Sequence, residues 1–401
     1  MSNAPRPLAG IRVLEFSHMV MGPVAGAILV ELGAEVFKLE PLLGDSTREL
    51  QGSGAGYFPM YNRNKRSISL DLKEPRGLDL ARRLAARSDV LIENFRPGVM
   101  EDLGLGYEAL RIVNPGLIYC SLKGFLAGPY ANRTALDEVA QMMGGLAYMT
   151  GPPGRPLRAG ASVVDVTGGM FGVIGILAAL QERHVTGVGQ KVSSALFETT
   201  AYLVGQHMAQ KAVTGQAAKP MPVRVSAWSI YDVFEVTDGE QVFIGVVSDA
   251  QWQSFCAAFG FAELARDPNL RTNRQRVAAR EYLLPKVRHG LSVLAKADVL
   301  ARLESAGLPF APISRPEDLF DDPHLAAAGG LVPTMLANGV AARLPILPIQ
   351  LNDDRPTQGG NLAGIGEHTR EILATLGISD AEFDALLAAR VIRTSSQGTF
   401  A

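Results

Sequence analysis

Short apolar runs alternate with amphipathic segments along the first half of the chain, and their lengths predict strands and helices in turn. The run IRVLEF (residues 11–16) is typical of a buried strand, residues 23–32 form a helical segment closed by Gly33, and EVFKLE (residues 35–40) is a second strand. A helix is expected at residues 77–87, and further strands at residues 67–72, 90–95 and 117–122. This pattern predicts an α/β fold built on an open, mainly parallel sheet.

The pattern changes after residue 195, where a long helix over residues 195–213 is expected to lead out of the sheet region. Two alternating strands, IYDVFEV and QVFIGVV, flank the turn Thr237-Asp238-Gly239 and predict a hairpin. Helices dominate residues 250–307. We therefore expect a large domain over residues 1–200, a linker over 201–221, a smaller α+β domain over 222–320, and a linker with a C-terminal return to the large domain over 321–401.

Composition and charge argue against several classes of protein. The 401 residues contain 38 Lys and Arg against 40 Asp and Glu, a net charge of −2 that provides no basic field for nucleic acid. The cysteines are only Cys120 and Cys256, so neither a disulfide framework nor a cysteine-built metal site is expected. The first residues lack the apolar core of a secretory leader, and residues 168–180 are short and glycine-rich for a membrane span. We therefore expect a cytoplasmic protein without membrane contact.

Three common catalytic patterns do not occur in the sequence. The first βαβ unit ends in Glu40, as in dinucleotide-binding proteins, but its loop SHMVMGPVAG lacks G-x-G-x-x-G, which argues against NAD. The six histidines are scattered without metal-ligand spacing, and there is no G-x-S-x-G elbow for a serine nucleophile. The βαβ topology still predicts a nucleotide crevice at the carboxyl ends of the strands.

A basic cluster suggests a phosphorylated ligand. Arg63, Lys65, Arg66 and Lys73 fall within eleven residues, and no acid lies in residues 61–70. A solvated charge run is the more common explanation, but cations beside strand ends also suit a ligand with several phosphates. The segments NFRPG (residues 94–98) and LKG (residues 122–124) follow two other strands, so they are expected to meet at the same edge of the sheet.

The apolar stretch SVVDVTGGMFGVIGILAAL (residues 162–180) carries one ionisable residue, Asp165. Its local pattern favours a helix N-cap, and the glycines that follow would let another backbone come close. With serine, cysteine and metal arrangements unsupported, a carboxylate remains for covalent chemistry. Asp165 and Asp137, in ALDEVAQMMGG, are the two candidates.

Several motifs in order resemble the family III CoA-transferases, the group that contains formyl-CoA transferase and carnitine CoA-transferase. They are PLAGIRVLEFSHMVMGP, GAEVFKLE, YNRNKRSISLDLK, DVLIENFRPGVMEDLGLGY, NPGLIYCSLKGF, DEVAQMMGG, VVDVTGGMFGVIGILAALQERHVTGVGQKV, DPNLRTNRQRVAARE, GLPFAPI and GEHTREIL. The resemblance implies a Rossmann-like, CoA-binding large domain interrupted by the smaller domain, and an interlocked homodimer with active sites at the subunit interface. It also implies acyl-CoA and a carboxylic acid as substrates, without a tightly bound cofactor or metal.

The same resemblance assigns roles to individual residues. Asp165 matches the nucleophile and Asp137 a supporting acid, while the backbone at Gly168 and Gly169 allows close approach and could steady an oxyanion. A helix start favours the ionised form of Asp165. The positions that match CoA contacts are Val20, Met21, Leu70, Asp71, Leu72, Lys73, Asn94, Phe95 and Arg96.

Three positions depart from the family pattern in the region of the CoA phosphates, namely Pro41, Asp102 and Thr134. We therefore expect phosphate contacts to be redistributed to Arg63, Arg66 or Arg133. Two alternatives remain open. An α-methylacyl-CoA racemase would need a second base, and its motif places a histidine where Leu136 stands; a non-catalytic CoA-binding protein would leave Asp165 inert. The sequence favours CoA transfer to a small carboxylic or dicarboxylic acid.

Overall fold

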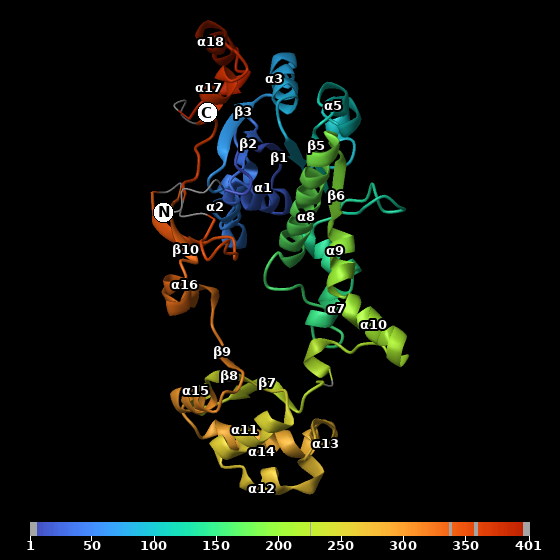
Figure 1. Cartoon of the computed structure of the whole chain (residues 1–401), viewed down its shortest axis with the longest axis vertical. Helices are drawn as coiled ribbons and strands as arrows, with labels where there is room; N and C mark the ends of the chain where they lie inside the picture. Colours follow the sequence, from blue (N-terminus) through green and yellow to red (C-terminus); the bar gives the residue numbers. More distant parts are fainter. Residues whose placement is uncertain (1–5, 225, 337–338, 357–359, 396–401) are drawn as a thin grey trace. The chain divides into compact units, whose positions relative to one another are not determined.

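The computed structural model describes residues 6–224, 226–336, 339–356 and 360–395. The chain forms two compact units, of which the larger comprises residues 1–222 and 323–401 and the smaller residues 223–322. The small domain expected at residues 222–320 differs from the smaller unit by no more than two residues at either end. Figure 1 colours both units along the sequence.

The larger unit is built on a seven-stranded sheet in the order β12-β3-β2-β1-β4-β5-β6. Every neighbouring pair is parallel except β12 and β3, so the prediction of a mainly parallel sheet is confirmed. The strand order reverses between β1 and β4, as in doubly wound nucleotide-binding folds. The strands are β1 (Arg12–Phe16), β2 (Glu35–Glu40), β3 (Arg66–Leu70), β4 (Val90–Glu93), β5 (Ile118–Lys123), β6 (Lys191–Ala195) and β12 (Ile392–Arg393).

Helices cover both faces of this sheet because its strands are apolar on both sides. One face packs against α1 (Met21–Glu31) and α8 (Val163–Thr186), which lie side by side in Figure 1. The other face packs against α3 (Pro75–Ala85), α5 (Tyr107–Val113), α17 (Thr369–Ala374) and α18 (Asp380–Ala388). The last two helices and β12 belong to the C-terminal segment, which returns to the large unit as predicted.

Shorter elements complete the larger unit. They are α2 (Tyr57–Tyr61), α4 (Val99–Asp102), α6 (Asp137–Met143), α7 (Leu146–Thr150), α9 (Leu196–Leu203), α10 (Gly205–Thr214), α16 (Pro323–Ala327), β10 (Leu331–Met335) and β11 (Ala341–Pro345). The single long helix expected at residues 195–213 is wrong, since Val204 separates α9 from α10.

The smaller unit packs helices against a three-stranded antiparallel sheet. The predicted hairpin is present, and Asp238 and Gly239 turn the chain with φ of 65° and 72°, a conformation that Gly and Asp tolerate. The strands are β7 (Ile230–Glu235), β8 (Gln241–Val246) and β9 (Phe310–Pro312). The helices are α11 (Asp249–Phe259), α12 (Ala262–Arg266), α13 (Asn273–Ala278), α14 (Arg280–Ser292) and α15 (Lys296–Ser305).

Helix α8 extends beyond both ends of residues 168–180, the stretch that the sequence indicated to be short for a membrane span. It has 24 residues, and among the described residues it is the one helix whose length and composition would allow it to cross a membrane. Its glycine-rich side packs against α1: a Cβ on residue 169 would lie 2.6 Å from the carbonyl oxygen of Met21, and one on residue 168 would lie 2.7 Å from Cε of Met21. These glycines therefore let α8 approach α1 closely, as part of the protein core.

Candidate active site

The loops after β1 and β4 meet where the strand order reverses. The side-chain amide of Asn94 accepts from the N–H of His18 at 3.1 Å and donates to the carbonyl of His18 at 2.8 Å. The ring of Phe95 lies 5.8 Å from that of His18. Because ligands of doubly wound folds bind outside the carboxyl ends of strands at such a point, this edge is the candidate nucleotide site.

Lys123 connects the next loop to this edge. Its Nζ lies 2.6 Å from Oε2 of Glu93 and donates to the carbonyl of Phe95, also at 2.6 Å. The prediction that the segments after β4 and β5 meet at one edge of the sheet is therefore confirmed.

Two members of the basic cluster do not face this edge. Arg63 is only 2% exposed, pairs with Glu31 at 2.9 Å and donates to the carbonyl of Pro345 at 2.8 Å. Arg66 begins β3, at the amino ends of the parallel strands, where it pairs with Glu35 and Glu371. The structure therefore does not support these two arginines as phosphate contacts, because internal carboxylates already occupy both.

The remaining positions expected to contact CoA are distributed around the carboxyl edge. Val20 and Met21 are buried where α1 begins, and Leu70 is buried at the end of β3. Asp71 accepts from the N–H of Lys73 at 2.9 Å. Leu72 is partly buried, whereas the side chains of Lys73, Arg96 and Arg133 are exposed.

Asp165 lies in the first turn of α8, whose N-cap is Ser162. Three of the N–H groups that a helix start leaves without intrahelical partners, those of Val163, Val164 and Asp165, are bonded here. That of Val163 donates to the carbonyl of Ala161 at 2.8 Å. Those of Val164 and Asp165 both donate to Oδ2 of Asp137 at 3.0 Å. The expectation that Asp165 caps this helix is therefore wrong, because the capping carboxylate comes from Asp137 on α6.

Asp137 is buried and held by further side chains. Nε2 of Gln141, one turn later on α6, donates to its Oδ1 at 2.5 Å, and Oε1 of Gln141 accepts from the N–H of Ala159 at 2.8 Å. The guanidinium of Arg158 lies 3.5 Å from the same Oδ1. Asp137 thus connects α6, the loop that carries Arg158, and the start of α8.

The surroundings of Asp165 disfavour its ionised form. Burial raises the pKa of Asp165 to about 7, the negative charge of Asp137 adds to the rise, and Arg158 opposes it. A helix start by itself favours the ionised carboxylate, but burial and the neighbouring acid oppose that tendency. An acid whose pKa lies near neutrality in a partly exposed position is a candidate for catalysis.

Two tyrosines on α2, Tyr57 and Tyr61, extend the site and were not among the residues predicted from the sequence. Burial and the negative charge of Asp165 raise the pKa of Tyr61, and the hydroxyl of Tyr57 lies 3.5 Å from that of Ser162. Both lie in GYFPMYN, which carries no catalytic pattern of its own. Only the packing of α2 near the start of α8 identifies them.

Gly168 and Gly169 are unsuited to the oxyanion role considered from the sequence. Both lie beyond the first turn of α8, where the helical hydrogen bonds use the backbone N–H groups. Because these two residues have no Cβ, Met21 of α1 can lie close to α8.

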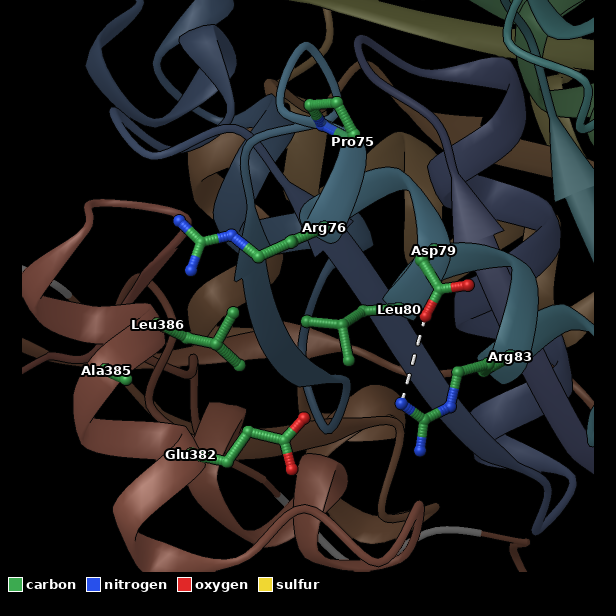
Figure 2. Close-up of a pocket in the computed structure, with 8 residues that line it drawn as sticks. All are labelled: Pro75, Arg76, Asp79, Leu80, Arg83, Glu382, Ala385 and Leu386. Carbon is green, nitrogen blue, oxygen red and sulfur yellow. Dashed lines mark ion pairs between the residues drawn. The ribbon is translucent and has the colours of Figure 1, made fainter.

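A separate pocket lies on the other helical layer of the larger unit, between α3 and α18 (Figure 2). Arg83 in its wall lies 3.9 Å from Asp79 and donates to the carbonyl of Leu376 at 2.8 Å. This pocket is lined by neither Asp165 nor Asp137, so the candidate active site is the carboxylate pair and not this groove.

The fold and the site together define a doubly wound α/β protein with a candidate nucleotide site at the carboxyl edge of its sheet and a pair of carboxylates at a helix start. Residues 8–369 match the model of CoA-transferase family III. The chain belongs to this family and is a CoA-transferase, so the family resemblance seen in the sequence is confirmed.

Curated relatives share most of their length with the chain. A succinate–glutarate CoA-transferase of Agrobacterium fabrum is 35% identical, over 94% of this chain and 97% of the relative. A formyl-CoA:oxalate CoA-transferase of Streptomyces coelicolor is 33% identical, over 96% and 99%. The crystal structure of a CAIB/BAIF family protein from Brucella suis superposes with a TM-score of 0.83 at 35% identity, covering 93% of this chain and 100% of that one.

Proposed function

We propose that the protein moves CoA from an acyl-CoA to a small carboxylic or dicarboxylic acid, with Asp165 as the covalent nucleophile. The observation that carries this proposal is the Asp165 carboxylate at the start of α8, next to the buried acid Asp137 that holds this helix start. The substrates in the names of the two relatives include succinate, glutarate and oxalate, and they support a dicarboxylic acid as donor or acceptor.

The reaction proceeds through four acyl transfers that balance without another reactant. An oxygen of Asp165 attacks the thioester carbonyl, the C–S bond breaks, and CoA leaves as a thiolate from a mixed anhydride. The thiolate then attacks the aspartyl carbonyl, which releases the donor acid and leaves an aspartyl-CoA thioester. The acceptor carboxylate attacks that thioester, the C–S bond breaks, and CoA leaves again as a thiolate from a second mixed anhydride. Attack by the thiolate on the acceptor carbonyl releases the new acyl-CoA and restores Asp165.

A carboxylate suits this sequence of steps because a mixed anhydride is about as activated as a thioester, so activation is conserved at each transfer. The route needs neither ATP nor metal. Asp137 supports it by fixing the backbone of Val164 and Asp165, and Arg158 reduces the repulsion between the two acids.

CoA binding is proposed at the edge where β1 and β4 diverge. The loop that Asn94 ties to His18, together with Val20, Met21 and Phe95, would contact the nucleotide. The exposed cations Lys73, Arg96 and Arg133 are the proposed phosphate contacts, in place of Arg63 and Arg66.

We propose a homodimer, interlocked as in the resemblance, because one side of the larger unit presents apolar side chains to solvent. Helix α10 has no buried residue, and α8, α9 and α10 carry exposed large apolar groups. They are Met170, Ile174, Leu177, Tyr202, Met208 and Val213.

We also propose a cytoplasmic location. Both cysteines are free, which is consistent with a reducing compartment.

The experiment that tests the function follows thioester exchange between a panel of acyl-CoA donors and carboxylic acids. We expect Asp165→Ala to lose transfer by at least about a thousandfold, because the nucleophile is removed. Hydroxylamine should convert Asp165 of the parent protein, mixed with acyl-CoA, to a hydroxamate that mass spectrometry locates. Full transfer by Asp165→Ala would overturn the proposal, and rapid exchange of the acyl α-proton with deuterium would favour the racemase.

A further inference from the structure

The interior of the larger unit holds a cluster of charged side chains that the proposed mechanism does not use. Glu15 on β1 lies between Lys38 on β2 and Lys65 just before β3, and all three side chains are almost completely buried. Nζ of Lys65 lies 2.8 Å from Oε2 of Glu15, and Nζ of Lys38 lies 3.5 Å from Oε1. Burying such charges costs free energy that their attraction need not recover, so stability alone does not explain the cluster.

Lys38 also donates to the backbone of the connection between β1 and α1, and Lys65 donates to the backbone of α1 just after it. Nζ of Lys38 donates to the carbonyl of Ser17 at 2.8 Å, where this connection begins. Nζ of Lys65 donates to the carbonyl of Pro23 at 2.9 Å, in the first turn of α1. Between these two points lies Met19, whose φ of 62° is in the left-handed region that disfavours its side chain. The two lysines therefore fix both ends of a strained loop.

The contacts of Lys65 match the donors of a charged ammonium group. Its three protons have three accepting residues, namely Glu15, Pro23 and Asn62, whose Oδ1 lies 3.1 Å from Nζ. Helix α1 leaves room for this arrangement at Gly26, since a Cβ there would lie 1.8 Å from Oε2 of Glu15 and 3.0 Å from Nζ of Lys65.

We propose that Glu15, Lys38 and Lys65 are positioning residues that hold the β1–α1 loop in the conformation that receives CoA. The loop they fix is the one that Asn94 ties to the edge after β4. It leads into Met21, which packs against Gly168 and Gly169 in the helix that carries Asp165. This inference rests on the proposed binding of CoA at this edge, and it assigns the cluster to loop geometry rather than to contact with substrate.

The experiment measures binding of desulfo-CoA, which has no reactive thiol, by calorimetry on the full chain. We expect Lys65→Met to raise the Kd roughly tenfold, or about 1.4 kcal/mol, because the carbonyl of Pro23 loses its donor. The KM for the acceptor acid should change much less than the KM for acyl-CoA. The double variant Glu15→Gln/Lys65→Met removes both charges and should recover thermal stability without recovering affinity, since that donor is still missing.

The matched control is Arg63→Met, which breaks a buried ion pair with Glu31 at the other end of the same helix. It should lower the melting temperature but leave the Kd for desulfo-CoA within about twofold. Equal affinity in the parent and both Lys65 variants would overturn the inference, as would a double variant that regains affinity together with stability. A parent chain that fails to bind desulfo-CoA would overturn this inference together with the proposed CoA site, whereas activity in Asp165→Ala would overturn only the proposed mechanism.

Discussion

The carboxylate of Asp137 accepts hydrogen bonds from the backbone N–H groups of Val164 and Asp165, each at 3.0 Å. One acid thus holds the helix start on which the other acid stands, although the two are 28 residues apart in sequence. The same proximity places two negative charges together and helps to raise the pKa of Asp165 to about 7, an effect in which burial is the larger cause.

The two functions of Asp137 can be separated by substitution. The amide introduced by Asp137→Asn still offers an oxygen to both N–H groups but carries no charge, whereas the methyl group left by Asp137→Ala offers neither oxygen nor charge. We expect Asp137→Ala to lower kcat by about tenfold to a hundredfold and Asp137→Asn to lower it much less, measured by thioester exchange. Equal losses in both variants would show that the charge, and not the hydrogen bonds, carries the role.

The pH dependence of transfer should report the ionisation of Asp165. Because the nucleophile must be ionised, kcat/KM should rise with pH and level off above about 7. Asp137→Asn removes the neighbouring negative charge and should move this limb to lower pH, while Arg158→Met removes the compensating cation and should move it to higher pH. If the rise of kcat/KM with pH occurs at the same pH in the parent and in both variants, the titrating group is not Asp165.

The free energy of unfolding should fall as the pH rises, because the buried Asp165 carboxyl group loses its proton. The folded pKa of Asp165 is raised above its usual 3.8, so the folded state retains a proton that the unfolded chain releases between about pH 4 and pH 7. As the pH rises through that range, the free energy of unfolding of the parent therefore falls relative to that of Asp165→Asn, whose side chain does not titrate. We expect Asp165→Asn to be more stable than the parent by roughly 4 kcal/mol at pH 8 and to show little gain at pH 4, measured by urea unfolding.

Exposed cations at the carboxyl edge should affect acyl-CoA binding without affecting folding. Lys73→Met should raise the KM for acyl-CoA by about threefold to tenfold at low salt, because one phosphate contact is lost, and leave the melting temperature unchanged. Lys191→Met is a suitable control, since Lys191 is also exposed but begins β6 at the amino ends of the strands. An equal effect of both changes would argue against a local phosphate contact.

The close contact between α8 and α1 leaves no room for a methyl group at residue 169. Gly169→Ala places Cβ 2.6 Å from the carbonyl oxygen of Met21 and should cost about 1–3 kcal/mol of stability and reduce transfer, because the start of α8 must shift. Gly205→Ala, where a Cβ meets no atom within 4 Å, should change neither quantity. Thermal unfolding and thioester exchange measure both effects.

The sequence by itself determined the parts of this protein that depend on local pattern. Apolar runs predicted the parallel sheet, and Asp238 and Gly239 predicted the hairpin of the smaller unit, because strand length and turn conformation are set by neighbouring residues. The ordered motifs predicted the family, which the match over residues 8–369 confirms.

Only the tertiary structure decided which charges meet. Arg63 and Arg66 resemble phosphate ligands in sequence, but each forms an ion pair with a glutamate more than thirty residues earlier in the chain, Glu31 and Glu35 respectively. Asp165 resembles a helix cap, yet the cap is Asp137 from another helix. Ionic and capping partners are chosen by packing between distant segments, and burial then sets the free energy of each charge, so neither can be obtained from local sequence.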